Sequence, residues 1–258
     1  MTSLKNKNVF ITGVTSGIGK SCAYAFAAEG ANLIISARRL SLVKEIGEDI
    51  KNKFGVKVYT FKLDVQNKTE VDNSIKSLPE EFKKIDILVN NAGLGIGLDK
   101  FYEDNPEGWE AMIDTNVKGL LYVTRAVVQG MVERESGHII NIGSLAGHEA
   151  YPKGAVYCAT KFAVDAITKS LRMDLVEKHI RVSTIDPGMV ETNFSMIRFR
   201  GDAEKAKNVY KGVDPLTGDD IADAVVFCAS RPANVNIAEM LILAGTQASA
   251  MVVHRENL

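Results

Sequence analysis

The chain of 258 residues is poor in cysteine and histidine, the residues that most often build disulfides and metal sites. Its three cysteines, Cys22, Cys158 and Cys228, are odd in number and show no CxxC spacing, which argues against a disulfide framework. We expect them to be small buried side chains in a reducing compartment. The four histidines are scattered and form no HExxH motif, so the sequence predicts no metal site.

The chain also lacks an excess of charge of either sign and a long apolar run. Lys and Arg number 31 against 32 Asp and Glu, for a formal net charge of −1. A nucleic-acid or anionic-membrane partner would favour a basic face, so we expect neither. No apolar run approaches the roughly 20 residues of a membrane span, and the polar stretch MTSLKNKN leaves no room for a signal peptide before the first strand. We therefore expect a cytoplasmic protein.

The organisation of the chain predicts an α/β fold. Short apolar runs rich in β-branched residues alternate with helical stretches of about 10–15 residues. The runs show no polar alternation, which is typical of parallel strands covered on both faces. No repeat or linker interrupts the pattern, so we expect one domain over 1–258. It would hold a doubly wound parallel sheet of about seven strands with helices on both faces.

A glycine-rich stretch follows the first expected strand. After Asn8–Thr12 the chain reads GVTSGIG over 13–19 and then enters an apolar-periodic helix to about residue 29. A strand, a glycine turn and a helix N-terminus together form an anion site, because unpaired backbone N–H groups face a phosphate. The spacing is GxxxGxG rather than GxGxxG, and an ordinary turn before a helix is the alternative. Its place after the first strand favours a dinucleotide site.

Arg38 and Arg39 stand at the end of the second expected strand, 31–37 (ANLIISA). In dinucleotide folds an acidic residue about 20 positions past the glycines takes the ribose 2′-hydroxyl. Two arginines in that place suit a 2′-phosphate, with which they form bidentate charge-assisted bonds. The sequence therefore predicts NADP as the cofactor, and a solvated pair that opens the next helix is the alternative.

Tyr157 and Lys161 lie at the start of a later apolar-periodic helix. At i and i+4 their side chains project from one helical face. An ammonium ~4 Å from a phenolate contributes on the order of 4 kcal/mol at an effective dielectric near 20. That is enough to lower a tyrosine pKa by roughly two or three units. Ser144 ends the apolar run 138–143 (HIINIG) and is placed to hold a substrate oxygen near the hydroxyl; an ordinary amphipathic helix is the alternative.

Further motifs stand at the carboxyl ends of other expected strands. LDV at 63–65 and NNAG at 90–93 each end a strand, and DPGMVET at 186–192 follows the strand 180–185. Ligands of doubly wound sheets bind beyond these ends, so the motifs together predict one site. Asn116 lies inside the long helical region from about 106 to 133, which is unfavourable for asparagine, and is either solvated or functional.

The stretch 193–212 (NFSMIRFRGDAEKAKNVYKG) is less regular than the rest of the chain. It mixes aromatic and basic residues beside the carboxyl end of a strand, which suits a substrate lid over about 189–212. A last helix, about 218–230, and a last strand, about 240–243, precede a tail over about 244–258.

These motifs together resemble the short-chain dehydrogenase/reductase family over nearly the whole chain. The resemblance implies a Rossmann fold and hydride transfer between the nicotinamide and a substrate carbon, with the protein positioning the reactants and managing protons. It implies that Tyr157 is the general acid/base and that Ser144 binds the reacting oxygen. Lys161 would lower the tyrosine pKa and hold the nicotinamide ribose, and Asn116 would hold a water in a proton relay behind the lysine.

The same resemblance assigns the remaining motifs to parts of the cofactor. Asp64 and Val65 would border the adenine, 91–93 the adjacent ribose and 187–192 the nicotinamide. The expected cofactor-binding residues are Gly13, Thr15, Ser16, Gly17, Ile18, Gly19, Arg38, Arg39, Asp64, Val65, Asn91, Ala92, Gly93, Tyr157, Lys161, Pro187, Gly188, Val190 and Thr192.

A narrower similarity, to the NADP-dependent 3-hydroxy acid (serine or L-allo-threonine) dehydrogenases, lies in FSMIRFRGDAEKA, RPANVNIAEM and TQASAMVVHR. It implies oxidation of small 3-hydroxy acids such as L-serine, L-allo-threonine, 3-hydroxypropionate or 3-hydroxyisobutyrate, or the reverse reduction, by a homotetramer. Ser144, Tyr157 and Arg198 would bind the substrate, with Arg198 as carboxylate anchor. A solvated loop arginine or a subunit contact is the alternative for Arg198.

Two other functions stay open. One is reduction of another carbonyl, such as a 3-oxoacyl thioester, a sugar or a xenobiotic. The other is an NADP-sensing protein without catalysis, which an incomplete set of catalytic residues would favour. All four catalytic residues are present, which argues against the sensor.

Overall fold

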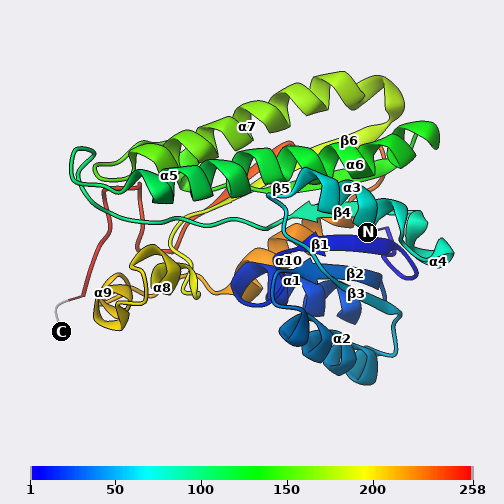
Figure 1. Cartoon of the computed structure of the whole chain (residues 1–258), viewed down its shortest axis with the longest axis horizontal. Coiled ribbons are helices and arrows are strands. Elements are labelled where there is room, and N and C mark those ends of the chain that lie inside the picture. Colours follow the sequence, from blue (N-terminus) through cyan, green and yellow to red (C-terminus); the bar gives the residue numbers. More distant parts are fainter. Residues whose placement is uncertain (1, 257–258) are drawn as a thin grey trace.

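The computed structural model describes residues 2–256 and centres on a seven-stranded sheet (Figure 1). The strand order is β3-β2-β1-β4-β5-β6-β7, and neighbouring strands pair in parallel. Because the order reverses between β1 and β4, a crevice opens beyond their carboxyl ends. The strands are β1 (Asn8–Thr12), β2 (Asn32–Ala37), β3 (Val58–Lys62), β4 (Ile87–Asn90), β5 (Gly137–Ile142), β6 (Ile180–Pro187) and β7 (Glu239–Ile242).

Helices cover both faces of this sheet, as the sequence predicts. In Figure 1, α1, α2 and α10 lie below the sheet, and α5, α6 and α7 lie above it. The helices are α1 (Gly17–Ala28), α2 (Leu40–Phe54), α3 (Lys68–Lys76), α4 (Glu80–Lys83), α5 (Pro106–Ile113), α6 (Leu120–Glu133), α7 (Ala155–Leu175), α8 (Phe194–Arg198), α9 (Ala203–Asn208) and α10 (Gly218–Ala229).

The core forms two layers because each central strand buries both of its faces. In β1, Val9 and Ile11 pack in the layer that holds α1, α2 and α10. The residue between them, Phe10, packs in the opposite layer with Val123 and Val127 of α6. This arrangement explains the continuous apolar runs of the sequence, since alternation would require one solvated face.

Two segments differ from the sequence-based expectation. The region 106–133 is not one α-helix, because a π-helical turn, Asp114–Gly119, separates α5 from α6. The stretch 193–212 is more regular than expected and contains the short helices α8 and α9. Asp202 caps α9 by accepting a hydrogen bond from the Lys205 backbone N–H at 3.0 Å, a local signal that the aromatic and basic composition obscured.

Two further observations bear on the chain's surroundings. Cys22, Cys158 and Cys228 are buried free thiols, as predicted. Within residues 2–256, no helix combines the length and the apolar character needed to cross a membrane.

Candidate active site

A cavity of ≈ 1250 Å³ lies at the carboxyl ends of the strands, and the lid covers part of it. The structure brings nearly all of the sequence-predicted site residues into its lining. Gly19 and Asn116 are the two exceptions among them, and both lie one layer behind the cavity wall. One concave site therefore unites motifs that are far apart in the sequence, as the convergence of strand ends predicts.

The glycine loop has the geometry of a phosphate cradle. Gly13 and Gly17 adopt positive φ angles of 75° and 56°, which glycine adopts without strain. A Cβ on Gly13 would lie 2.9 Å from the Ala92 Cα, so only glycine fits there. The Asn91 side chain holds the loop by donating hydrogen bonds to the Thr12 and Gly13 carbonyls at 2.9 and 3.1 Å. The loop leads directly into the N-terminus of α1, which suits a pyrophosphate.

The two predicted arginines stand at the rim of this cradle. Arg39 Nη2 donates a hydrogen bond to Thr15 Oγ1 at 2.7 Å, so its guanidinium bridges β2 and the glycine loop. Arg38 is exposed and lines the same cavity. A phosphate held near the loop would meet two guanidinium groups, and the donor set therefore fits a 2′-phosphate.

Tyr157 and Lys161 share one face of α7 and meet Ser144 in the cavity, as predicted. Lys161 Nζ lies 6.0 Å from the centroid of the Tyr157 ring and donates a hydrogen bond to the Ile142 carbonyl at 2.9 Å. Burial lowers the pKa of Lys161 to about 8, and the charge of Asp186 acts in the opposite direction. The lysine is therefore an ammonium that deprotonates more readily than usual.

The expected lowering of the Tyr157 pKa is not met in this geometry. Burial raises the pKa of Tyr157 well above its ordinary value, and this effect outweighs the Ser144 hydrogen bond and the Arg198 charge, which lower it. The ammonium of Lys161 points to a backbone carbonyl rather than to the phenol oxygen. A neutral tyrosine in this place is suited to donate a proton.

Asn116 acts on the backbone behind the site. It lies in the π-helical turn and is 2% exposed. Its Oδ1 accepts a hydrogen bond from the Leu94 N–H at 2.9 Å, and its Nδ2 donates to the Leu94 carbonyl at 2.8 Å and to Thr160 Oγ1 at 3.0 Å. The awkward mid-helix asparagine is thus explained by its contacts, which join the end of β4 to α7.

Arg198 of the lid reaches over the catalytic residues. Its guanidinium carbon lies 5.3 Å from the Tyr157 ring centroid, and its Nη2 donates to Tyr151 Oη at 2.9 Å. Its Nε donates to the Gly97 carbonyl at 3.3 Å, so the lid is tied to the loop after β4. The arginine therefore brings a positive charge to the point where a substrate would meet Tyr157.

Sequence reasoning missed one aromatic residue of this wall, Tyr151, and included another, Phe194, only as part of the expected lid. Tyr151 and Phe194 both line the cavity, and the Phe194 ring lies 5.5 Å from that of Tyr157. Gly95 permits this packing, because a Cβ there would lie 2.6 Å from Phe194 Cζ. A tyrosine between Ser144 and Tyr157 in the chain was the available signal for Tyr151.

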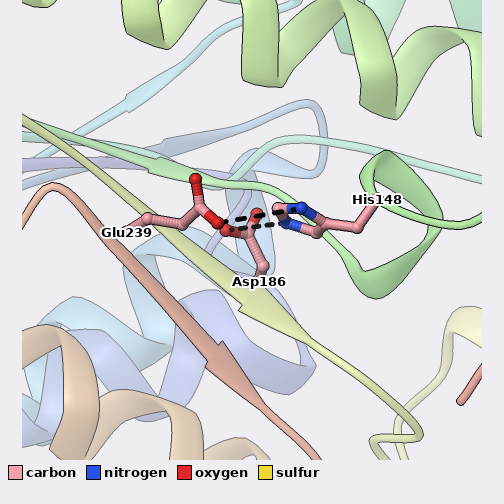
Figure 2. A group of neighbouring side chains, drawn as sticks. All are labelled: His148, Asp186 and Glu239. Atoms are coloured by element: carbon pink, nitrogen blue, oxygen red, sulfur yellow. Dashed lines mark ion pairs between the residues drawn. The ribbon is translucent and has the colours of Figure 1, made fainter.

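It also missed a cluster of His148, Asp186 and Glu239 beside the cavity (Figure 2). One ligand atom from each residue lies within 4.8 Å of the others, so the cluster has the composition of a metal site that the scattered histidines did not suggest. The three residues come from distant segments, and no spacing motif joins them.

Comparison with known proteins agrees with this geometry. The family model described as short chain dehydrogenase matches residues 7–202. An NADP-dependent 3-hydroxy acid dehydrogenase of Schizosaccharomyces pombe is 44% identical over 258 residues, with all of both chains covered. The NADP-dependent 3-hydroxy acid dehydrogenase YdfG of Salmonella typhi is 45% identical and covers 96% of this chain and 99% of its own.

A solved structure is also similar to this chain in both fold and sequence. The closed form of serine dehydrogenase complexed with NADP+ superposes with a TM-score of 0.90 at 43% identity, over 96% of this chain and 100% of that one. The cradle, the Ser144, Tyr157 and Lys161 arrangement and these matches agree, and the chain belongs to the short chain dehydrogenase family of oxidoreductases.

Proposed function

We propose that this chain is an NADP-dependent dehydrogenase of small 3-hydroxy acids, which oxidises the hydroxyl-bearing carbon or reduces the corresponding carbonyl. The relatives at 44% and 45% identity carry that activity in their names. The substrates proposed are L-serine, L-allo-threonine, 3-hydroxypropionate and 3-hydroxyisobutyrate.

The cofactor is NADP. The cradle formed by Gly13 and Gly17 fits its pyrophosphate, and Arg38 and Arg39 fit its 2′-phosphate. Asp64 and Val65 line the adenine side, and Pro187, Gly188, Val190 and Thr192 line the nicotinamide side. When bound, the nicotinamide accepts or supplies the hydride at its C4 carbon.

The protein's own residues manage the proton. In the reductive direction Tyr157 donates its hydroxyl proton to the substrate oxygen as the carbonyl carbon gains the hydride, and in the oxidative direction the phenolate takes that proton back. Ser144 holds the same oxygen. Lys161 brings an ammonium to the same face of α7, 6.0 Å from the Tyr157 ring centroid, and its pKa of about 8 allows it to pass a proton on.

The position of Arg198 is the observation that supports 3-hydroxy acids as the substrate class. Its guanidinium lies 5.3 Å from the Tyr157 ring, and two of its nitrogens donate to Tyr151 and Gly97. Arginine has five N–H donors, which leaves donors for a carboxylate. A 3-hydroxy acid places its carboxylate two carbons from the reacting carbon, so one small molecule can span Arg198 and Tyr157.

Absorbance of the reduced cofactor tests the proposal. Purified protein is offered NADP+ or NAD+ with each of the four acids, and Tyr157→Phe serves as the blank. NADP-linked turnover that disappears in Tyr157→Phe is the expected result. Turnover only of a thioester, sugar or xenobiotic carbonyl would support the proposed reaction but reject 3-hydroxy acids as the substrates. NADP binding without any turnover would indicate a sensor.

We also propose a homotetramer in the cytoplasm. Buried free thiols suit a reducing compartment. The exposed large apolar side chains include Met173 on α7, Phe227 on α10 and Leu241 on the edge strand β7. Such residues suit subunit contacts. Analytical ultracentrifugation at micromolar concentration measures the assembly directly, and a monomer would refute it.

A further inference from the structure

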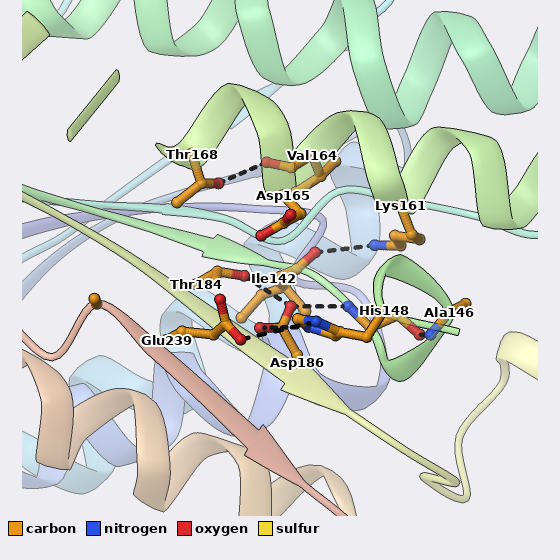
Figure 3. A network of polar contacts seen from close by, with 12 residues as sticks. Ile142, Ala146, His148, Lys161, Val164, Asp165, Thr168, Thr184, Asp186 and Glu239 are labelled. Atoms are coloured by element: carbon orange, nitrogen blue, oxygen red, sulfur yellow. Dashed lines mark hydrogen bonds and ion pairs between the residues drawn. The ribbon is translucent and has the colours of Figure 1, made fainter. Parts of the chain in front are cut away.

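A row of polar side chains runs from Glu239 through His148 to Asp186 (Figure 3). Asp186 in turn contacts the backbone of Ser144. The innermost member of the row is Asp186 at the end of β6, which is 2% exposed. Asp186 Oδ1 accepts hydrogen bonds from Thr184 Oγ1 at 2.8 Å and from the Ser144 N–H at 3.2 Å. Gly143 makes room for it, because a Cβ on Gly143 would collide with Asp186 Oδ1. The carboxylate therefore fixes the backbone that presents Ser144.

The second oxygen of this carboxylate faces a histidine. Asp186 Oδ2 lies 3.3 Å from His148 Nε2, and the other ring nitrogen, Nδ1, lies 3.8 Å from Glu239 Oε1 (Figure 2). Both nitrogens of the ring thus meet carboxylate oxygens. These are charge contacts rather than hydrogen bonds, and they place the ring between the two carboxylates.

The outer end of the row reaches solvent through α7. Lys169 Nζ lies 3.8 Å from Glu239 Oε2 and 2.8 Å from Asp165 Oδ2. The charged groups that face His148 are therefore Asp186 from β6 and Glu239 from β7, with Lys169 and Asp165 behind Glu239. Glu239 is exposed and Asp186 is buried, and His148 is the ion-pair partner of Asp186 among the described residues.

We propose that Asp186 is a positioning residue for the reaction: its carboxylate, flanked by His148, fixes the backbone that presents Ser144 to the substrate oxygen. The inference rests on the proposed roles of Ser144, Tyr157 and Lys161.

The electrostatics of the row support this assignment. A buried carboxylate without a partner takes up a proton rather than stay charged. Burial does raise the pKa of Asp186, and the Thr184 hydrogen bond and the charge of His148 lower it again. The charge of Asp186 in turn raises the pKa of Lys161 against the burial that lowers it to about 8. Loss of the Asp186 charge would therefore lower the pKa of Lys161 further.

A divalent cation is the competing occupant of this cluster. A single cation would bind one ring nitrogen and both carboxylates. Here the two carboxylates approach opposite nitrogens of the ring, at 3.3 and 3.8 Å, and neither contact is a hydrogen bond. Chelation distinguishes a bound cation from these direct contacts.

The pH profile of kcat in the reductive direction tests the proposal, with NADPH and 3-oxopropionate, or the carbonyl that the wild type turns over. Asp186→Asn keeps an acceptor for the Ser144 N–H and removes the charge. We expect kcat to fall about 5-fold, because a charge-assisted hydrogen bond becomes a neutral one. The alkaline decline of kcat should also begin at lower pH, because the Lys161 pKa falls. His148→Gln keeps an N–H donor beside Asp186 and is expected to keep the wild-type profile. KM for the carbonyl and Kd for NADPH stay unchanged, because Arg198 and the cradle are intact.

Controls separate this inference from the proposed function. His179→Asn removes a histidine from an exposed site where φ is 53°, a conformation that asparagine tolerates, and is expected to match the wild type. A wild-type kcat and a wild-type pH profile for Asp186→Asn, with Tyr157→Phe inactive, would overturn the positioning role alone. An active Tyr157→Phe would overturn the proposed chemistry. Wild-type activity that EDTA removes and Zn²⁺ or Mg²⁺ restores, but not in His148→Gln, would replace the positioning role by a cation site.

Discussion

The side chain of Asn116 exchanges two hydrogen bonds with the backbone of Leu94, 22 residues away in the chain. The side-chain amide thus satisfies the backbone N–H and carbonyl of Leu94, as a neighbouring strand would. Asn116 also donates a hydrogen bond to Thr160, which links the segment after β4 to α7. Both α7 and the end of β4 carry site residues. The π-helical turn that holds Asn116 therefore joins two walls of the active site, which a regular helix would not do.

Asn116→Ala is expected to destabilise the protein by about 2–4 kcal/mol, because it leaves the buried N–H and carbonyl of Leu94 without partners. Urea unfolding measures the free-energy difference. Asn52→Ala, at an exposed position inside α2, is the matched control and is expected to be neutral or slightly stabilising. Equal effects of the two substitutions would contradict a structural role for Asn116.

Lys161 is expected to make stability depend on pH. Burial lowers its pKa from 10.5 to about 8. Below pH 8 the folded protein carries a buried ammonium at a cost of about 3 kcal/mol. Between pH 8 and 10.5 the unfolded chain still holds that proton and the folded protein has lost it, so stability rises with pH in this window.

Lys161→Met removes this dependence. The free energy of unfolding of the wild type relative to Lys161→Met should increase by about 3 kcal/mol between pH 7.5 and 10.5. Lys44→Met, at an exposed position of α2, is expected to follow the wild type across that range. A constant difference between wild type and Lys161→Met would show that the folded protein does not perturb this lysine.

The sequence predicts the fold and most of the cavity wall because these depend on local patterns. The sheet buries both faces of β1, so this strand is a continuous apolar run that includes Val9, Phe10 and Ile11. The turn after it needs a positive φ angle, which the sequence shows as Gly13. Parallel topology then places every strand's carboxyl end at one edge, which gathers the site residues without any knowledge of distances.

Features that depend on contacts between distant segments were not predictable. The π-helical turn holds Asn116 against Leu94, and no local sequence pattern indicates that contact. The cluster of His148, Asp186 and Glu239 joins three segments whose only relation is their adjacency across β6 and β7. The predicted lowering of the Tyr157 pKa was also wrong. Burial of the tyrosine raises this pKa, and the attraction between Tyr157 and Lys161 alone does not include burial.

Arg38→Asp is expected to weaken NADP binding by about 10- to 100-fold, since a hydrogen bond to a charged group contributes roughly 1.5–3 kcal/mol. NAD binding should change little, so the preference moves toward NAD. Cofactor Kd values from fluorescence titration measure both. Arg125→Asp, an exposed arginine of α6 away from the cavity lining, controls for the change in net charge. An unaltered ratio of the two Kd values would show that Arg38 does not contact the 2′-phosphate.

Arg198→Ala is expected to raise KM for the 3-hydroxy acid by about 10- to 100-fold, because a carboxylate loses its charge-assisted partner. KM for NADP should stay unchanged, since the cradle lies at the other end of the cavity. Arg198→Lys keeps the charge without the bidentate geometry and is expected to lie between wild type and Arg198→Ala. Initial rates at saturating NADP+ with varied acid give these values.

Two controls separate carboxylate binding by Arg198 from a structural role of Arg198 in the lid. Arg200 lines the same cavity and also stands on the lid, but its φ of 53° favours replacement by asparagine over alanine. Arg200→Asn is expected to leave KM for the acid near the wild-type value. A substrate alcohol without a carboxylate should show the same KM with wild type and Arg198→Ala. A KM increase for that alcohol as large as for the acid would mean that Arg198 shapes the lid through Tyr151 and Gly97, and the anchor role would then be wrong.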